Sequence, residues 1–125
     1  MRSRFTRFLQ VSLAALLVVI GLGAVANPAY AVTTCTTSGA LCIWTGANYT
    51  GTRHVVQEFP CDDFSVADGK DNNTTSLKVN ANAINGWTLF LGHNCSEISG
   101  WIWYGPGTAI PDLASAVDNQ FSSAG

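Results

Sequence analysis

Two hexapeptides with the same residue pattern constrain the fold of this chain more than any other feature. Asp71 to Ser76 reads DNNTTS, and Asp118 to Ser123, 47 positions later, reads DNQFSS. Each has two residues with side-chain carbonyl oxygens, two variable positions, a hydroxyl residue and a serine. A pattern repeated at this distance indicates that one supersecondary unit occurs twice in the chain.

The residues ahead of the hexapeptides repeat as well. The first copy has Trp44, Tyr49 and Gly51 in the spacing W-x-x-x-x-Y-x-G, and the second has Phe90, Cys95 and Glu97 at the same offsets. An aromatic residue five positions before another can close over a folded hairpin, in which a glycine permits a positive φ. We predict two motifs, one at about 41–80 and the other at about 86–125.

Residues 1–31 have the pattern of a signal peptide. Three arginines precede an apolar segment from Val11 to Val25, and Ala29-Tyr30-Ala31 has the small-x-small pattern of a cleavage site. A retained membrane helix is the alternative, but no basic stop-transfer flank follows. We expect a secreted, extracellular protein that begins at Val32 and has no membrane contact after cleavage.

The 94 residues from Val32 onward are expected to form a single domain, 32–125. They carry three basic and eight acidic side chains, a formal net charge of −5. No cluster of lysine or arginine is present to displace counterions, which argues against nucleic acid as a partner. A domain of this size buries a marginal core and benefits from cross-links.

Four cysteines supply those cross-links: Cys35, Cys42, Cys61 and Cys95. An even number in an exported chain indicates disulfides, although three pairings are open. We favour Cys35 with Cys42, which closes a short loop, and Cys61 with Cys95, which ties the two halves together. A zinc site is the alternative, but the sequence has no C-x-x-C pair.

The pattern of short apolar segments and turn residues predicts an all-β protein with a Greek-key sandwich. The expected strands are Leu41–Thr45, Arg53–Phe59, Ser76–Val79, Gly86–Leu91 and Gly100–Tyr104. One short turn of helix is the only helical structure expected, within Ile110–Val117.

These motifs resemble the signature of the βγ-crystallin superfamily. Its aromatic-x-x-x-x-aromatic-x-Gly motif is met by Trp44, Tyr49 and Gly51, with the distant serine met by Ser76. Calcium-binding members add [ND]-[ND]-x-x-[ST]-S, which both hexapeptides satisfy. The second hairpin departs from the signature at Cys95 and Glu97, so the geometry of that corner is in doubt. The resemblance implies a disulfide-stabilised sandwich of two Greek keys.

The leader, the loop from Cys35 to Cys42, the segment LCIWTGANYTG and the later NCS are similar to secreted bacterial peptidase inhibitors with this fold. That family includes inhibitors of thermolysin-like metallopeptidases. The resemblance implies a monomeric binding protein with a secreted peptidase as partner. No inhibitory residue can be carried over, because the inhibitory loop does not align. The alternative is a calcium-stabilised extracellular module, or a killer-toxin-like protein, without inhibitory activity.

Calcium takes oxygen ligands from carboxylates, amides, hydroxyls and backbone carbonyls. The candidate ligands are the side chains of Asp71, Asn72 and Thr75 with the Asn73 carbonyl, and those of Asp118, Asn119 and Ser122 with the Gln120 carbonyl. The resemblance implies that the motifs exchange ligands and that each site adds a hairpin carbonyl, near Gly46-Ala47 and Gly92-His93. The alternative is that these residues only form polar turns.

Catalysis has little support, since no nucleophile motif surrounds any serine and the two histidines stand alone. We therefore expect no enzyme activity. In the segment GWIWYGPG, Trp101 and Trp103 would share one face of a strand. We favour an interpretation in which one face of this strand belongs to the core and the first repeat covers the other. If they are exposed instead, the two tryptophans could stack on a sugar or a partner protein.

Overall fold

The computed structural model describes residues 32–57 and 59–125. The expected signal peptide, residues 1–31, lies outside the described residues. The elements in chain order are β1 (Leu41–Gly46), the 3₁₀ helix η1 (Ala47–Tyr49), β2 (Thr50–Val56), β3 (Asp62–Asp63), β4 (Ser76–Val79), β5 (Trp87–Phe90), the 3₁₀ helix η2 (Glu97–Ser99), β6 (Trp101–Tyr104), β7 (Ala109–Ile110) and β8 (Ser123–Ala124). Within the described part of the chain, no helix is long and apolar enough to cross a membrane.

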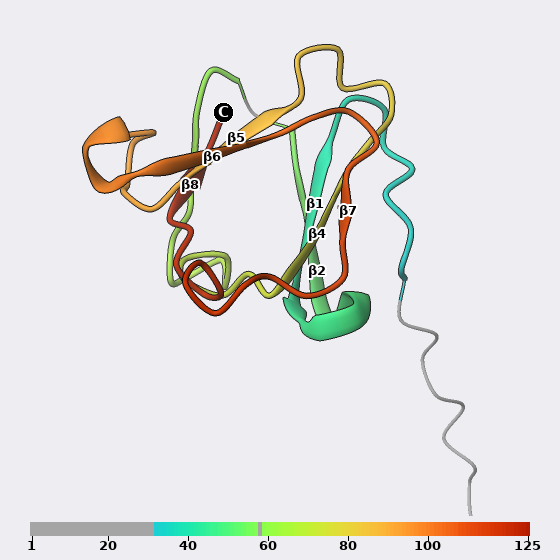
Figure 1. Ribbon diagram of the computed structural model, residues 1–125, viewed down its shortest axis with the longest axis horizontal. Helices are drawn as coiled ribbons and strands as arrows, with labels where there is room; N and C mark the ends of the chain where they lie inside the picture. Colours follow the sequence, from blue (N-terminus) through green and yellow to red (C-terminus); the bar gives the residue numbers. More distant parts are fainter. Residues whose placement is uncertain (1–31, 58) are drawn as a thin grey trace, which may run out of the picture.

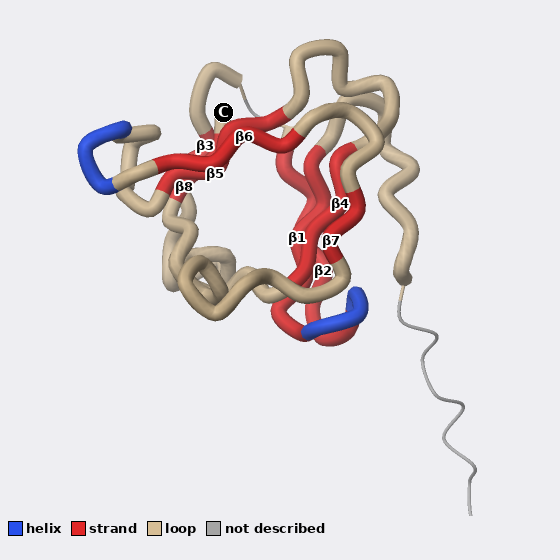
Figure 2. Tube along the Cα trace, in the orientation of Figure 1, coloured by secondary structure: helices blue, strands red, loops and turns tan. Residues whose placement is uncertain are grey.

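Two four-stranded antiparallel sheets face each other (Figures 1 and 2). The first sheet has the strand order β2-β1-β4-β7, and the second has β3-β8-β5-β6. The core lies between them and includes Leu41, Ile43, Leu77, Trp87 and Leu89, each at most 1% exposed. These side chains alternate along their strands with outward-facing ones, because successive residues of a strand point to opposite faces. The predicted all-β sandwich of two Greek keys is confirmed.

Each motif contributes three strands to one sheet and lends one strand to the other. Strand β3 of motif one pairs with β8, and β7 of motif two pairs with β4. The two lent strands have two residues each, as does β8. Segments this short carry no readable alternation, which is why the sequence did not predict them.

The segment after β7 differs from expectation. The short turn of helix expected within Ile110–Val117 is reduced to a single turn near its end, where the Ala114 carbonyl accepts from the Val117 and Asp118 amides at 2.9 and 3.0 Å. Ile110 ends β7, and bends follow it. The Leu113 amide donates to the Thr75 carbonyl at 2.8 Å, and Leu113 is buried. The Asn48 amide likewise donates to the Pro111 carbonyl at 2.6 Å, so contacts with motif one hold the start of this segment. The second expected strand is also displaced, since β2 begins at Thr50 and ends at Val56.

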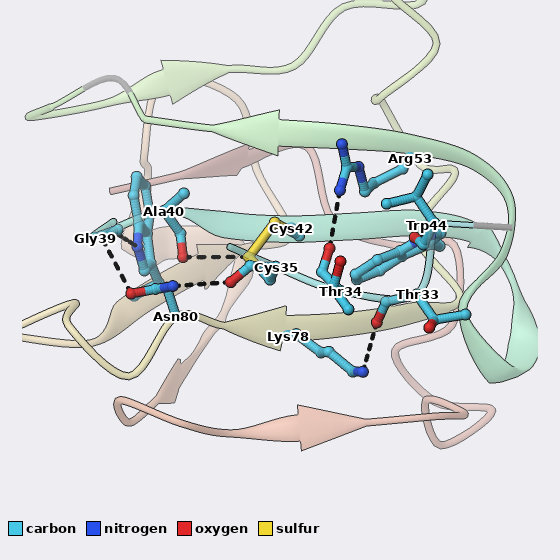
Figure 3. Close-up of a disulfide and its surroundings, with 12 residues drawn as sticks. Thr33, Thr34, Cys35, Gly39, Ala40, Cys42, Trp44, Arg53, Lys78 and Asn80 are labelled. Atoms are coloured by element: carbon cyan, nitrogen blue, oxygen red, sulfur yellow. Dashed lines mark hydrogen bonds between the residues drawn. A yellow bond between two sulfur atoms is a disulfide. The ribbon is translucent and has the colours of Figure 1, made fainter. Parts of the chain in front are cut away.

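Residues 32–40, here called the N-terminal strap, lie over the outer face of the first sheet (Figure 3). Side chains of the sheet hold the strap by its carbonyl groups: Trp44 Nε1 donates to Val32 at 2.9 Å, Arg53 to Thr34 at 2.9 Å and Lys78 to Thr33 at 2.6 Å. The disulfide Cys35–Cys42 joins the strap to β1. The second disulfide, Cys61–Cys95, joins motif one to motif two. This is the pairing that we favour from the sequence.

Candidate functional site

The two hexapeptides lie side by side, each in the loop that leads into a strand of its own motif (Figure 1). The backbone N–H of Asn72 donates to the Phe121 carbonyl at 2.9 Å, and the backbone N–H of Asn119 donates to the Thr74 carbonyl at 2.9 Å. Asn72 and Asn119 both have left-handed backbone conformations, with φ of 47° and 54°. The two loops are therefore related by an approximate two-fold axis, and each completes the hydrogen bonds of the other.

The hydroxyl groups cross between the loops. Ser122 Oγ donates to Asn72 Oδ1 at 3.2 Å, and Thr75 Oγ1 donates to Asn119 Oδ1 at 3.3 Å. We group each of these pairs with the aspartate that precedes its asparagine in sequence. The first candidate site comprises Asp71, Asn72 and Ser122, and the second comprises Asp118, Asn119 and Thr75. Each site thus takes its hydroxyl from the other motif, which is the kind of exchange that the resemblance implies.

One carboxylate oxygen in each site lacks a hydrogen bond. Asp71 Oδ1 and Asp118 Oδ1 are buried, and neither has a hydrogen-bond partner among the described residues. His93 Nε2 lies 3.7 Å from Asp71 Oδ1, which is too long for a hydrogen bond. A buried carboxylate oxygen without a partner is costly unless a cation or donor reaches it. No hydrogen-bond donor among the described residues reaches either oxygen, although the His93 ring lies within ion-pair distance of Asp71. The oxygens of both sites suit a hard cation.

Lys70, next in sequence to Asp71, does not supply a positive group to this carboxylate. Its Nζ contacts Asp62 Oδ1 and Oδ2, both at 2.9 Å, and Asp68 Oδ2 at 3.5 Å. Burial disfavours the charged amine, but the hydrogen bonds and attraction to Asp62 outweigh it and raise the pKa of Lys70. The ammonium group is therefore held by other carboxylates.

Two buried serines fix the hairpins beside these sites. Ser76 Oγ donates to the Gly46 carbonyl at 2.6 Å and accepts from the Tyr49 amide at 3.1 Å. Ser123 Oγ donates to the Gly92 carbonyl at 2.6 Å and accepts from the Cys95 amide at 2.9 Å. The hairpin glycine carbonyls that lie near the sites are thus anchored by the last residue of each hexapeptide.

The second hairpin keeps the corner geometry despite its departures from the signature. Asn94 and Cys95 have φ of 55° and 52°, as Asn48 and Tyr49 have 54° and 60°. Where the Tyr49 ring packs edge-on against Trp44 at 5.2 Å, Cys95 instead forms a disulfide. The second hairpin is two residues longer, since Trp44 pairs with Arg53 but Phe90 pairs with Trp101. The positive φ near the end of the corner accordingly moves to Gly100.

Asn73 and Gln120, the residues expected to offer backbone carbonyls, are exposed beside the two sites. Their side chains bond locally: Asn73 Nδ2 donates to the Gly69 carbonyl at 3.0 Å, and Gln120 Nε2 to the Asp118 carbonyl at 3.4 Å. Sequence reasoning missed Asp63, whose Oδ1 accepts from the Asn94 amide at 2.7 Å and lies 3.1 Å from His93 Nδ1. This carboxylate positions the second hairpin, and its partners lie 30 or more residues away.

The structure also decides the other candidates. All four cysteines are in disulfides, so they are not zinc ligands, and the described residues contain no cluster of three or more His, Cys, Asp or Glu side chains that could hold a metal. The favoured interpretation, in which the first repeat covers Trp101 and Trp103, is wrong, since these residues are 51% and 54% exposed.

Compared by sequence, the chain matches no protein-family model and no curated protein. Compared by structure, it matches several solved βγ-crystallin domains. One structure, reported on the evolution of the eye-lens βγ-crystallin domain fold, has a TM-score of 0.62 at 19% identity and covers 74% of this chain and 89% of that one. A mutant βγ-crystallin domain from Clostridium beijerinckii has a TM-score of 0.53 at 22% identity, and the match covers 68% of this chain and 93% of that one. A βγ-crystallin from Ciona intestinalis has a TM-score of 0.52 at 15% identity, and the match covers 68% of this chain and 95% of that one. Together with the exchanged strands and the paired folded hairpins, these similarities show that the chain has the βγ-crystallin fold.

Proposed function

We propose that this protein is a secreted binding module, stabilised by two calcium ions that are held between its two motifs. The observation that carries the proposal is the pair of buried carboxylate oxygens, Asp71 Oδ1 and Asp118 Oδ1, which lack hydrogen-bond partners in equivalent positions. Polar turns alone do not account for this pair, because a turn would use the carboxylate oxygen as an acceptor.

In the first site, Asp71, Asn72 and Ser122 would hold the ion, and in the second site Asp118, Asn119 and Thr75 would hold it. The Asn73 and Gln120 carbonyls and the hairpin carbonyls are further candidate ligands. A bound calcium ion supplies positive charge that neutralises the carboxylate and joins side chains of the two motifs. Each site has one formal carboxylate, so we expect the weak affinity of extracellular modules, with dissociation constants of about 10⁻⁴ to 10⁻³ M.

Calcium should raise the melting temperature of the protein that begins at Val32. At about 100 times the dissociation constant, one site adds about 2.7 kcal/mol to the free energy of unfolding. Calorimetric titration should give two ions per chain. Asp71→Ala and Asp118→Ala should each remove one ion, and the double variant should bind none. Asp112→Ala, which removes an exposed carboxylate outside both sites, is the control and should bind two.

The proposal fails if calcium up to about 10⁻² M, ten-fold above the weak end of the extracellular range, leaves the melting temperature unchanged. It also fails if the double variant keeps the calcium response. Magnesium in place of calcium distinguishes a specific site from general screening, because magnesium demands a smaller and more regular set of ligands.

Peptidase inhibition is a second candidate function, favoured by the loop between β5 and β6. This loop presents Ile98 at 97% exposure and is tied down by the disulfide at Cys95 and by the bond from Asn94 to Asp63. A constrained loop with an apolar tip can occupy a peptidase cleft at a low entropic cost. Stoichiometric inhibition of a thermolysin-like peptidase that is lost in Ile98→Asp but kept in Ile84→Asp, an equally exposed position elsewhere, would support this function. An inhibition constant that Ile98→Asp leaves unchanged would contradict the role of this loop.

A further inference from the structure

We propose that the outer face of strand β6 is a binding platform for a neutral carbohydrate, which stacks on Trp101 and Trp103. This site is separate from the hexapeptides and does not depend on calcium.

The two tryptophans share the outer face of an edge strand. Ile102 and Tyr104 pack against the core, whereas Trp101 and Trp103 point outward and are half exposed. Residues two apart in a strand are about 6.6 Å apart, close to the length of one sugar ring. The pair can therefore contact neighbouring rings of a saccharide chain. The electron-rich ring face suits the apolar C–H face of a sugar.

Trp103 is held rigidly by its surroundings. Its Nε1 donates to the Asn85 carbonyl at 2.9 Å, so the only polar atom of the indole is already paired. A Cβ placed at Gly86 would lie 2.9 Å from Trp103 Nε1, and one placed at Gly105 would lie 3.0 Å from the ring. The indole thus packs closely against the backbone at both glycines. A ring fixed in advance loses little conformational entropy when a ligand stacks on it.

The equivalent face of the first sheet carries different chemistry and a different occupant. Strand register makes Arg53 equivalent to Trp101 and Val55 equivalent to Trp103, since Trp44 and Phe90 head the two repeats. On the first sheet, Trp44, Arg53 and Lys78 hold the carbonyl groups of the strap. On the second sheet, Phe90 and Gly125 stand where Trp44 and Lys78 would be, and they have no side-chain donor. An extended peptide on the second sheet would find no equivalent side-chain donors for its carbonyl groups. The exposed face therefore favours a ligand that stacks on the two rings.

The distribution of charge indicates that this ligand is neutral. The described residues include three basic side chains, and each is engaged elsewhere: Arg53 and Lys78 with the strap, and Lys70 with Asp62. No lysine or arginine is therefore left to recognise a sulfate or uronate group at the platform. A hydroxyl-rich ligand without charge fits this surface, because stacking needs no counter-ion.

A pocket borders the platform and supplies polar groups. It has a volume of about 190 Å³ and is lined by Phe59, Asn82, Ile84, Asn85 and Gly86, among others. Asn85 and Gly86 line this pocket and also contact the Trp103 indole, so the pocket and the platform share two residues. The exposed side-chain amides of Asn82 and Asn85 can donate to and accept from sugar hydroxyls. An aromatic surface beside a few polar groups is typical of a small-molecule site.

Calorimetry with three soluble hexasaccharides tests the proposal: β-1,4-linked glucose, β-1,4-linked N-acetylglucosamine and α-1,4-linked glucose. At least one should bind saturably, in chelator as well as in calcium. Trp101→Ala and Trp103→Ala should each raise its dissociation constant about ten-fold or more, as expected for an aromatic contact at the centre of a site. Trp103→Phe, which keeps a ring, should restore part of the affinity.

The matched control is Val55→Ala, at the position equivalent to Trp103 on the other sheet, and it should bind as the unmodified protein does. Melting temperatures of all variants show whether they fold. The proposal is overturned if none of the three sugars binds at about 10⁻² M, or if Trp101→Ala with Trp103→Ala leaves the binding unchanged. It is also overturned if the face proves to be a self-contact, that is, if no sugar binds and sedimentation shows a dimer that the double variant dissolves.

Discussion

At the scale of residues, the two motifs share a buried serine hydroxyl that binds each hairpin at the same position. Ser76 and Ser123 are each fully buried, and each hydroxyl bridges two backbone groups of its own hairpin. A hydroxyl can donate once and accept twice, so it satisfies a carbonyl and an amide that the sharp corner leaves without partners. The serine bridge is present at both corners, whereas the aromatic contact of Tyr49 is replaced at the second corner by the Cys95 disulfide.

Ser76→Ala and Ser123→Ala should therefore each lower the free energy of unfolding by about 1–3 kcal/mol, since both bridged backbone groups lose their partner in a buried place. Urea unfolding in chelator measures this without a contribution from calcium. Ser115→Ala, at an exposed turn position, should change stability by less than about 0.5 kcal/mol. Equal and small effects at all three serines would show that the hairpins are held by other contacts.

At the scale of elements, the two disulfides join different parts of the molecule. Cys35–Cys42 spans seven positions and joins the strap to β1, where three side-chain bonds also hold the strap. Cys61–Cys95 spans 34 positions and joins the segment before β3 to the second hairpin. A longer closed loop removes more entropy from the unfolded chain, so the second disulfide should contribute more stability.

Replacing both cysteines of a pair by alanine should show this difference. Loop closure predicts that Cys61→Ala with Cys95→Ala lowers the free energy of unfolding by about 1.4 kcal/mol more than Cys35→Ala with Cys42→Ala, within the usual 2–4 kcal/mol for a disulfide. Denaturant unfolding of both double variants measures the difference. The reverse order would mean that covering Trp44 with the strap outweighs chain entropy.

At the scale of the whole molecule, the exchange of β3 and β7 makes the two motifs depend on each other. Each sheet is completed by a strand of the other motif, and the core between the sheets is shared. The same exchange brings the hexapeptides together, so each candidate site contains residues of both motifs. Calcium bound there would stabilise the association of the motifs, whereas the tryptophan platform belongs to the second sheet alone.

The sequence by itself determined the repeat unit, the Greek-key class and the candidate oxygen ligands. The repeat unit and the Greek-key class are confirmed, whereas the oxygen ligands stay predictions. The confirmed inferences depend on the spacing of Trp44, Tyr49 and Gly51 and on the composition of the hexapeptides, which are local properties set by turn chemistry within a few residues. The favoured cysteine pairing likewise followed from loop lengths and the division into halves. After Ile110 only one turn forms, at Ala114, because contacts with Thr75, far away in sequence, hold the start of that segment.

Only the tertiary structure decided which groups meet. Thr75 joins Asn119 across 44 positions, and Ser122 joins Asn72 across 50. Such pairs depend on strand exchange, and the lent strands are too short to be read from a pattern. The exposure of Trp101 and Trp103 could not be predicted from the sequence either. Alternation along a strand places the two rings on one face but does not say what covers that face. The physical cause is that burial is a property of packed sheets, whereas spacing is a property of one strand.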